Sequence, residues 1–508
     1  MIIILYIFTF SKMSEQIINK NKESLHIEES AHEFKNIAKE TKTEHQEDNV
    51  PKEISYGETS YRWFFLISFC LSTFSNQMQW VTFSAILNDF SINYEIATWK
   101  VDMFSLLYMI ICIVTCIPEA WLLDSYSIRI TLILAAACNI IGSGLKLLIN
   151  KDSSLACCYV GQSIAGLFQS ALLNSPGKIA ANWFREDIRT VICTVCCLSV
   201  TIGALVGYLW NLMFIKKNSS QEDFKDQTFY YLLSEFIVNF VFYVPSFFIT
   251  KDKPDIPPSP SQEENINKPP GLIESLRILF SKVKFIYLLV IYTLTVAYFD
   301  IMSTIINLLL ELYTISGDQS SVIYAVSSVV GMVASLIFSK ILDKTKKFKL
   351  IMIILTIMGV IFQSLYTLLL ELIESKKLNA YAIGLVVYSL INISIVSVFT
   401  IGMNYACEIT YPVGESISNS IMASLPQALS IGLTFLCDYF INDHSDKKWI
   451  SNIILLVMLV ISVIFVFLLD EKLDRQEIEH GGKLGNKNEH KGNNEHIVIE
   501  MKHKKENI

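Results

Sequence analysis

The chain has 508 residues, of which 52% are hydrophobic and 18% are charged, and its mean hydropathy is +0.43. A soluble protein of this length is far less apolar, so the composition indicates a membrane protein with several spans. The formal net charge of −7 comes mainly from polar tails, and nothing in it predicts a nucleic-acid partner.

The residues that usually bind metals or form disulfides occur in places that predict neither role. All 11 cysteines lie in or beside apolar runs, so we expect no disulfide framework. Cys193 and Cys196 have the spacing of a redox or metal motif, but inside an apolar run this spacing is more typical of helix packing. No apolar run contains a histidine, and no paired catalytic carboxylates or nucleophile–base arrangement occurs. The sequence therefore predicts no metal, no cofactor and no enzymatic activity.

The chain begins with an apolar segment that is followed by a polar one. Residues 1–12 are apolar but too short to cross a bilayer, and they lack the basic residues that open a signal peptide. We therefore favour Met13 as the true start over a signal peptide. Residues 13–58 are rich in Lys, Glu, Asn and His, which predicts that residues 1–60 form a disordered cytoplasmic tail.

Twelve apolar runs of membrane-spanning length follow this tail. They fall at about 62–87, 101–122, 129–149, 155–176, 190–214, 228–250, 285–312, 320–342, 350–373, 379–405, 416–441 and 449–469. A polar, proline-rich stretch separates the runs into six and six. We predict an N-terminal half at 61–250, a cytoplasmic linker at 251–283, a C-terminal half at 284–469 and a disordered cytoplasmic tail at 470–508. This pattern predicts an all-α integral membrane protein with the twelve-helix major facilitator fold, whose two halves enclose a central site.

The lysines and arginines of the short loops predict the orientation in the membrane. The loops that include Arg185, Lys340 and Lys349 carry more of them than the opposite loops, which places both tails in the cytoplasm. The opposite side then holds the sequence Asn218-Ser219-Ser220, so Asn218 is a candidate glycosylation site. We expect the plasma membrane as the host, lipid as the surrounding partner and a monomeric protein.

The most informative stretch is YTLTVAYFDIMSTIIN, at residues 292–307. Asp300 lies near the centre of this apolar run, which contains no basic residue. A carboxylate at the centre of a membrane helix costs about 2.5–3.5 kcal/mol on insertion scales, so such residues usually face a cavity or a partner. Tyr298 and Phe299 are candidates to line the same space. The alternative is that Asp300 bonds to Ser and Thr of neighbouring helices or is protonated.

Polar or aromatic residues in three other spans add to this site. Trp80, Gln169 and Gln427 lie at positions where, together with Asp300, they predict a group near the membrane midplane. For each single amide the alternative is a hydrogen bond to a neighbouring helix. A carboxylate beside aromatic faces suits a small organic cation, because a desolvated cation–π contact contributes about 2 kcal/mol.

Charged residues recur at matching places in the two halves. Asp124 ends the second run and Arg129 opens the third, whereas Asp343 ends the eighth and Lys346 follows it. Such clusters can hold two helices together in one state of a transporter that rocks between states. The alternative is a topology signal made of ordinary helix-end charges. The recurrence favours the first interpretation, so all four are candidate gating residues.

Several short motifs form an ordered set over about residues 61–469. They are Gln79-Trp80, Tyr108-Met109, Trp121-Leu-Leu-Asp124 with Ile128-Arg129-Ile130, Pro176-Gly-Lys-Ile-Ala180 with Trp183-Phe184, Arg277-Ile-Leu-Phe280, Ser303-Thr-Ile-Ile-Asn307 and Glu408-Ile-Thr-Tyr-Pro412. This set resembles the feline leukaemia virus subgroup C receptor-related transporters, a major facilitator family associated with choline and haem. The resemblance implies that Trp80, Gln169 and Gln427 contact the ligand, and we add Tyr108 and Met109 as candidate substrate residues.

Asp300 is where the sequence departs from this family. The resemblance implies a tyrosine at this position, as one wall of an aromatic cage around a trimethylammonium group. An aspartate replaces a π-face with a full charge, which retains a cationic substrate but leaves its identity open. The alternatives are a preference for primary amines such as ethanolamine and a role in proton coupling.

Three functions follow from these observations. The leading hypothesis is a carrier that moves choline or a related small cation by alternating access, as a uniporter driven by membrane potential. The second is export of haem or porphyrin, although the absence of histidine from the apolar runs disfavours axial ligation of iron. The third is a non-transporting membrane receptor or sensor.

Overall fold

The computed structural model describes residues 59–149, 155–216, 219–254, 272–311, 313, 315, 317–376, 379–411, 413–442, 449–470 and 473–475. All of them belong to one compact unit, Tyr56–Ile508. Our predictions for the start of the chain, for most of both tails, for much of the linker and for glycosylation at Asn218 concern residues outside these ranges. The predicted disorder is wrong at the beginning of the C-terminal tail, where Asp474 forms an ion pair with Lys282 at 2.8 Å and Arg475 is buried.

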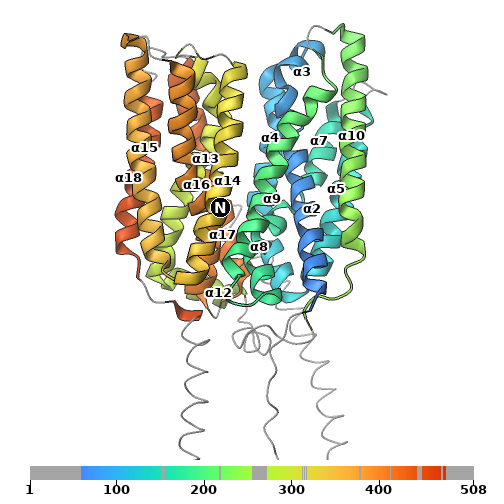
Figure 1. Ribbon diagram of the computed structural model, residues 1–508. Helices are drawn as coiled ribbons and strands as arrows, with labels where there is room; N and C mark the ends of the chain where they lie inside the picture. The colour runs from blue at the N-terminus through green and yellow to red at the C-terminus, as the bar shows by residue number, and fades with distance from the viewer. Residues whose placement is uncertain are drawn as a thin grey trace, which may run out of the picture. The chain divides into compact units, whose positions relative to one another are not determined.

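The N-terminal half consists of long helices, coloured blue to green in Figure 1. They are α2 (Tyr61–Trp80), α4 (Thr98–Ser125), α5 (Ile128–Lys146), α7 (Leu155–Gly166), α8 (Gln169–Trp183), α9 (Arg189–Trp210) and α10 (Gln221–Phe247). Shorter elements extend two of these helices, namely η1 (Ser84–Ile86) and α3 (Leu87–Asn93) after α2, and η2 (Asn211–Met213) after α9.

The C-terminal half, coloured yellow to red, follows a short helix of the linker, α12 (Leu272–Ser281). Its helices are α13 (Val283–Glu311), α14 (Gly317–Thr345), α15 (Phe348–Lys376), α16 (Ala380–Thr410), α17 (Glu415–Asn442) and α18 (Trp449–Leu468). Figure 1 shows the helices of this half side by side with those of the first half, and both sets run in the same general direction.

The helices account for the predicted number of membrane spans. Within the described ranges, 11 stretches are long and apolar enough to cross a membrane, and one of these, Leu155–Trp183, comprises both α7 and α8. The twelfth span is α2, whose 20 residues pack against α9 and α10. It is less apolar because it buries polar side chains such as Ser72, which shares a hydrogen bond of 2.9 Å with Ser246 of α10. The all-α, twelve-helix prediction is confirmed.

Apolar side chains also cover outward faces of the bundle. Ile337, Ile464 and Phe467 are each more than half exposed, at 55%, 57% and 56%. Exposure of many such side chains to water is unfavourable, whereas lipid tails are as apolar as the side chains themselves. The surface therefore suits a protein that is surrounded by lipid.

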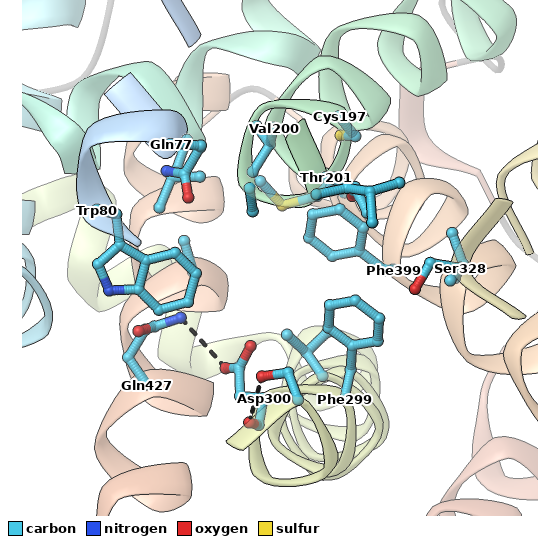
Figure 2. A pocket seen from close by; sticks show the side chains of 18 of the residues that line it. Gln77, Trp80, Cys197, Val200, Thr201, Phe299, Asp300, Ser328, Phe399 and Gln427 are labelled. Atoms are coloured by element: carbon cyan, nitrogen blue, oxygen red, sulfur yellow. Dashed lines mark hydrogen bonds between the residues drawn. The ribbon is translucent and has the colours of Figure 1, made fainter. Parts of the chain in front are cut away.

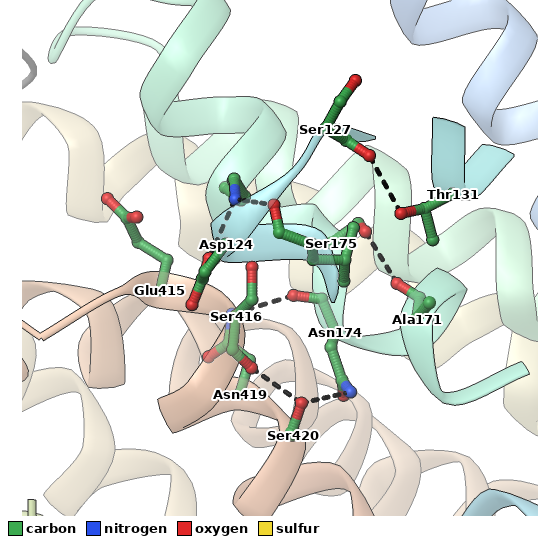
Figure 3. A network of polar contacts seen from close by, with 12 residues as sticks. Asp124, Ser127, Thr131, Ala171, Asn174, Ser175, Glu415, Ser416, Asn419 and Ser420 are labelled. Carbon is green, nitrogen blue, oxygen red and sulfur yellow. Dashed lines mark hydrogen bonds and ion pairs between the residues drawn. The ribbon is translucent and has the colours of Figure 1, made fainter. Parts of the chain in front are cut away.

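The two halves contact each other at the end of the bundle that carries α12, which we call the linker end. Asn174 of α8 donates a hydrogen bond to Ser420 of α17 at 2.6 Å, and Figure 3 shows this contact. Asn404 of α16 donates to the Thr190 hydroxyl of α9 at 2.8 Å. Hydrogen bonds across the boundary between the halves close the bundle at this end.

Candidate substrate site

A cavity lies between the two halves. Helices α2, α8 and α9 line it from one side, and α13, α14, α16 and α17 line it from the other. The predicted site residues that line it are Trp80, Gln169, Phe299, Asp300 and Gln427. The tertiary structure therefore brings together residues from four helices that are far apart in the chain.

Asp300 provides the only charged side chain among the described residues that line this cavity. It is 9% exposed, and one of its carboxylate oxygens accepts a hydrogen bond of 3.2 Å from the Gln427 side-chain amide. Figure 2 shows Asp300 and Gln427 next to each other, joined by this bond. A buried carboxylate is stabilised by an opposite charge, and no basic side chain is among the described residues that line the cavity.

Aromatic rings lie around the carboxylate. Figure 2 shows the Trp80 indole on the side of Gln427, and Phe299 and Phe399 on the other side of the space before Asp300. The rings of Phe299 and Tyr324 are 6.3 Å apart between centroids. An aromatic ring attracts a cation to its face, so rings beside a carboxylate are an arrangement that can bind a positive group.

The helical period determines which polar residues of α2 reach the cavity. Gln77 and Trp80 are three positions apart, so they share one face of the helix, and both line the cavity. Asn76 and Gln79 share another face, where each donates a hydrogen bond of 3.0 Å to the Asn139 side chain of α5. Gln77 was not among our predicted site residues, although its spacing from Trp80 was a usable signal.

Phe399 and Tyr324 also line the cavity without having been predicted. Both lie in ordinary apolar runs, where an aromatic residue is usually part of the packing, so the sequence carried no signal for them. Only the packing of α14 and α16 against the other helices decided their position.

Three predicted substrate residues lie outside the lining of the cavity. Tyr298 is 1% exposed, and its hydroxyl donates to the Gln363 side chain of α15 at 2.6 Å. Its neighbour Phe299 reaches the cavity because successive helix residues point about 100° apart. Tyr108 is fully buried in the N-terminal half, and Met109 is not among the lining residues either.

The predicted charge cluster of the N-terminal half is divided between two contacts. Asp124, at the linker end of α4, forms an ion pair with Lys178 of α8 at 2.8 Å, and Figure 3 shows it beside the start of α17. Arg129 instead donates through its side chain to the Thr250 carbonyl at 3.2 Å. Asp124 and Arg129 therefore stabilise different parts of this end of the bundle.

The cluster of the C-terminal half lies across the boundary between the halves. The carboxylate oxygens of Asp343 accept hydrogen bonds from the backbone N–H groups of Thr190 and Val191, at 3.0 and 2.9 Å. These groups belong to the first turn of α9, where N–H groups have no intrahelical partner and a negative charge is favourable. Lys346 donates to the Glu186 carbonyl at 2.7 Å.

The sequence profile of the Major Facilitator Superfamily matches residues 65–417. The chain belongs to this superfamily. It is therefore a multi-pass integral membrane protein with the fold and the relatives of a transporter rather than those of an enzyme.

Several relatives of this transporter have names that describe a substrate. It is 27% identical over 430 residues to the choline/ethanolamine transporter FLVCR1 of Felis catus, a match that covers 83% of this chain and 74% of the relative. It is 24% identical to the human choline/ethanolamine transporter FLVCR2, over 84% of this chain and 81% of the relative. It is also 28% identical to the uncharacterized MFS-type transporter C09D4.1 of Caenorhabditis elegans, over 82% of this chain and 70% of the relative. The resemblance to the receptor-related transporter family is confirmed.

Solved structures agree on the fold. A double tryptophan mutant of XylE superposes with a TM-score of 0.64 at 14% identity, over 84% of this chain and 99% of that one. A bacterial homologue of the iron transporter ferroportin, in an outward-facing state, gives a TM-score of 0.59 at 10% identity, over 82% and 100%. At such identities the likeness establishes the major facilitator fold and no substrate.

Proposed function

We propose that this transporter moves a small organic cation of the choline and ethanolamine class across the membrane by alternating access. The observation that carries the proposal is Asp300, the single charged side chain among the described residues of an aromatic-lined cavity between the halves. Two relatives named choline/ethanolamine transporters support the same class of substrate.

The residues around Asp300 support a binding mode in which different side chains contact different parts of the cation. Gln427 donates to one carboxylate oxygen and thereby fixes the orientation of the group. The other oxygen is available to an ammonium group in the cavity. Trp80 and Phe299 then provide π-faces for the rest of the cation, with cation–π contacts worth about 2 kcal/mol when desolvated. A primary ammonium donates hydrogen bonds to the carboxylate, whereas a trimethylammonium group is attracted by charge alone.

The contacts at the linker end support alternating access. They join the two halves on that side, so under this proposal release there requires that Asn174 separate from Ser420 and Asp343 from the start of α9. Each contact is a small number of hydrogen bonds with net contributions of about 1 kcal/mol, which allows them to break and reform in a transport cycle. A cycle of this kind is the general mode of such two-half carriers.

Membrane potential is a sufficient driving force for uniport of a cation. One positive charge gains about 2.3 kcal/mol per 100 mV, which corresponds to roughly 50-fold accumulation. Our proposal places the protein in the plasma membrane, with both tails in the cytoplasm, so that a negative interior drives uptake.

Uptake of radiolabelled choline and ethanolamine, compared between the native protein and Asp300→Asn, tests this function. We expect the variant to reach the surface normally and to lose at least about 100-fold in uptake, because a desolvated cation loses its counter-charge. The Glu371→Gln variant is a matched control, since that carboxylate bonds to Tyr313 at 2.7 Å and does not line the cavity. Undiminished uptake by Asp300→Asn, or equal competition by the neutral carbon isostere of choline, contradicts the proposal.

A further inference from the structure

We propose that Glu119 of α4 is a positioning residue, which holds the interruption of the fourth span so that Gln169 faces the cation in the cavity. The inference rests on the proposed function, because it assigns Gln169 to the substrate. It concerns a carboxylate that does not itself line the cavity.

The fourth span is interrupted between α7 and α8. Helix α7 ends at Gly166 and α8 begins at Gln169. Between them Phe168 has a φ of +66°, in the left-handed region that a residue with a Cβ atom rarely adopts. Such a conformation persists only when the surrounding structure maintains it, and it occurs often at functional sites.

Glu119 provides contacts that maintain the interruption. One of its carboxylate oxygens accepts a hydrogen bond from the Phe168 backbone N–H at 3.1 Å, and the other accepts from the Ala171 N–H at 2.7 Å. The side chain of Phe168 makes no capping bond to α8. A carboxylate from a neighbouring helix therefore fills the place of an N-cap, where free N–H groups and the helix dipole both favour negative charge.

The capped end of α8 carries the cavity residue. Gln169 is the first residue of α8, is 4% exposed and lines the cavity. Its side-chain oxygen has no hydrogen-bond partner within the described part of the protein. The direction of this amide therefore depends on the backbone on either side of it, which is the backbone that Glu119 binds at Phe168 and Ala171.

A double-mutant cycle separates positioning from a purely structural role. We expect Glu119→Gln to raise the KM for choline about tenfold while the maximal rate per surface molecule changes less than about twofold, since a neutral amide can accept from only one of the two N–H groups. In the Gln169→Ala background the same substitution should raise the KM by less than about twofold, because residues that act through one another are not additive. A full tenfold effect in both backgrounds overturns the proposal.

The Glu235→Gln variant is the matched control. Glu235 is a carboxylate of the same half, is 1% exposed and accepts a hydrogen bond of 2.8 Å from Thr82, but it does not line the cavity or contact α8. The Glu235→Gln substitution should leave the KM for choline unchanged. If Glu119→Gln fails to reach the surface, Glu119→Asp makes the same comparison, because it retains the charge and shortens the reach. An unchanged KM in the variant that reaches the surface also overturns the proposal.

A readout without substrate keeps this inference separate from the proposed function. We would measure the rate at which a maleimide labels position 169 in Gln169→Cys, with and without Glu119→Gln, by mass spectrometry of the purified protein. We expect a change of about fivefold or more at this position, and less than twofold for Leu173→Cys one turn further along α8. If neither cation is transported but the labelling changes as expected, the proposed function fails and the positioning role stands. An equal change at both positions, or none, rejects the positioning role.

Discussion

The interior of the N-terminal half and the central cavity both contain ionisable side chains, but they surround them differently. In the N-terminal half, Lys146 donates a hydrogen bond of 3.0 Å to Gln162 of α7, and Glu235 of α10 accepts one of 2.8 Å from Thr82. Both side chains are 1% exposed, and their partners belong to the same half, Gln162 in α7 and Thr82 in the turn after α2. Asp300 instead has one amide partner and faces an open cavity.

From this difference we infer that Lys146 and Glu235 stabilise the fold, whereas Asp300 binds the proposed ligand. Lys146 and Glu235 have their hydrogen-bond partners within one half, so they keep these partners while the halves move relative to each other. Under our proposal, the Asp300 carboxylate, which has space before it, gains an opposite charge only when the cation is bound. The predictions that follow test this distinction, from the largest expected effect to the smallest.

We expect the largest effect at Asp300, where a substitution should abolish most of the uptake without lowering the stability of the fold. The Asp300→Asn variant should lose at least about 100-fold in uptake, while its thermal unfolding temperature stays equal or rises, because the substitution removes a buried charge that has no cationic partner in the cavity. Differential scanning fluorimetry of the purified protein measures the second quantity. A lower unfolding temperature would show that Asp300 stabilises the fold in the same way as Lys146.

The opposite result should hold for Lys146→Met. Removal of this ammonium group leaves Glu235 without a nearby positive charge and Gln162 without its donor, so the free energy of unfolding should fall by about 3 kcal/mol. Uptake per surface molecule should keep its KM for choline within about twofold, since Lys146 does not line the cavity. Denaturant titration and concentration-dependent uptake measure the two quantities. An increase in the KM without loss of stability would remove the distinction between the two regions.

A smaller effect is expected from the aromatic wall of the cavity. The Trp80→Leu variant should raise the KM for choline about tenfold, which corresponds to the loss of one cation–π contact of about 1–2 kcal/mol. Competition by the neutral isostere of choline should be unaffected, because that molecule carries no charge for the ring to attract. If Trp80→Leu weakens the apparent affinity for choline and for the isostere equally, Trp80 contributes packing and no cation–π contact.

The contacts at the linker end should contribute less still. The Asn174→Ala variant removes the hydrogen bond to Ser420, worth about 1 kcal/mol, and so should shift the population toward the state that is open at this end by about fivefold. The thiol of Cys407 is 3% exposed in the present state and lies beside Asn419 at this boundary. Its rate of maleimide labelling should rise by the same factor, and an unchanged rate would show that Asn174 does not hold the closed state.

The smallest effect concerns Asp474, a partly exposed carboxylate outside the spans. Burial raises its pKa, but hydrogen bonds from Lys282 and Lys284 outweigh burial and lower the pKa below the usual value. Since the folded pKa is depressed, the carboxylate stabilises the protein above the unfolded pKa, and this contribution disappears as the pH falls through the folded pKa. Asp474→Asn should therefore cost less than about 1 kcal/mol at pH 7, and the difference from the native protein should vanish in acid. A difference that persists in acid would exclude the charge as its cause.

Hydropathy predicted the helices well, because a membrane span is a property of a continuous stretch of chain. Asp300 was equally visible, since one carboxylate in a run without basic residues stands out in the sequence alone. The pairing of charges was less predictable. Asp124 bonds to Lys178 rather than to the nearby Arg129, because helix packing, not sequence distance, determines which basic group approaches it.

The lining of the cavity shows the same limit. Tyr298 and Phe299 are adjacent in the sequence, yet one bonds to Gln363 inside the C-terminal half and the other faces the cavity. Adjacent residues of a helix point in different directions, but the sequence does not show which of the two side chains faces the cavity between the halves.

The sequence by itself determined the spans, their division into six and six, and the presence of Asp300 within a span, because each depends on local composition. The tertiary structure alone decided that Asp300 meets Gln427 and that the Glu119 carboxylate binds the backbone of Phe168, 127 and 49 positions away. Contacts between such distant residues depend on how whole helices pack, and no local period in the chain records that packing.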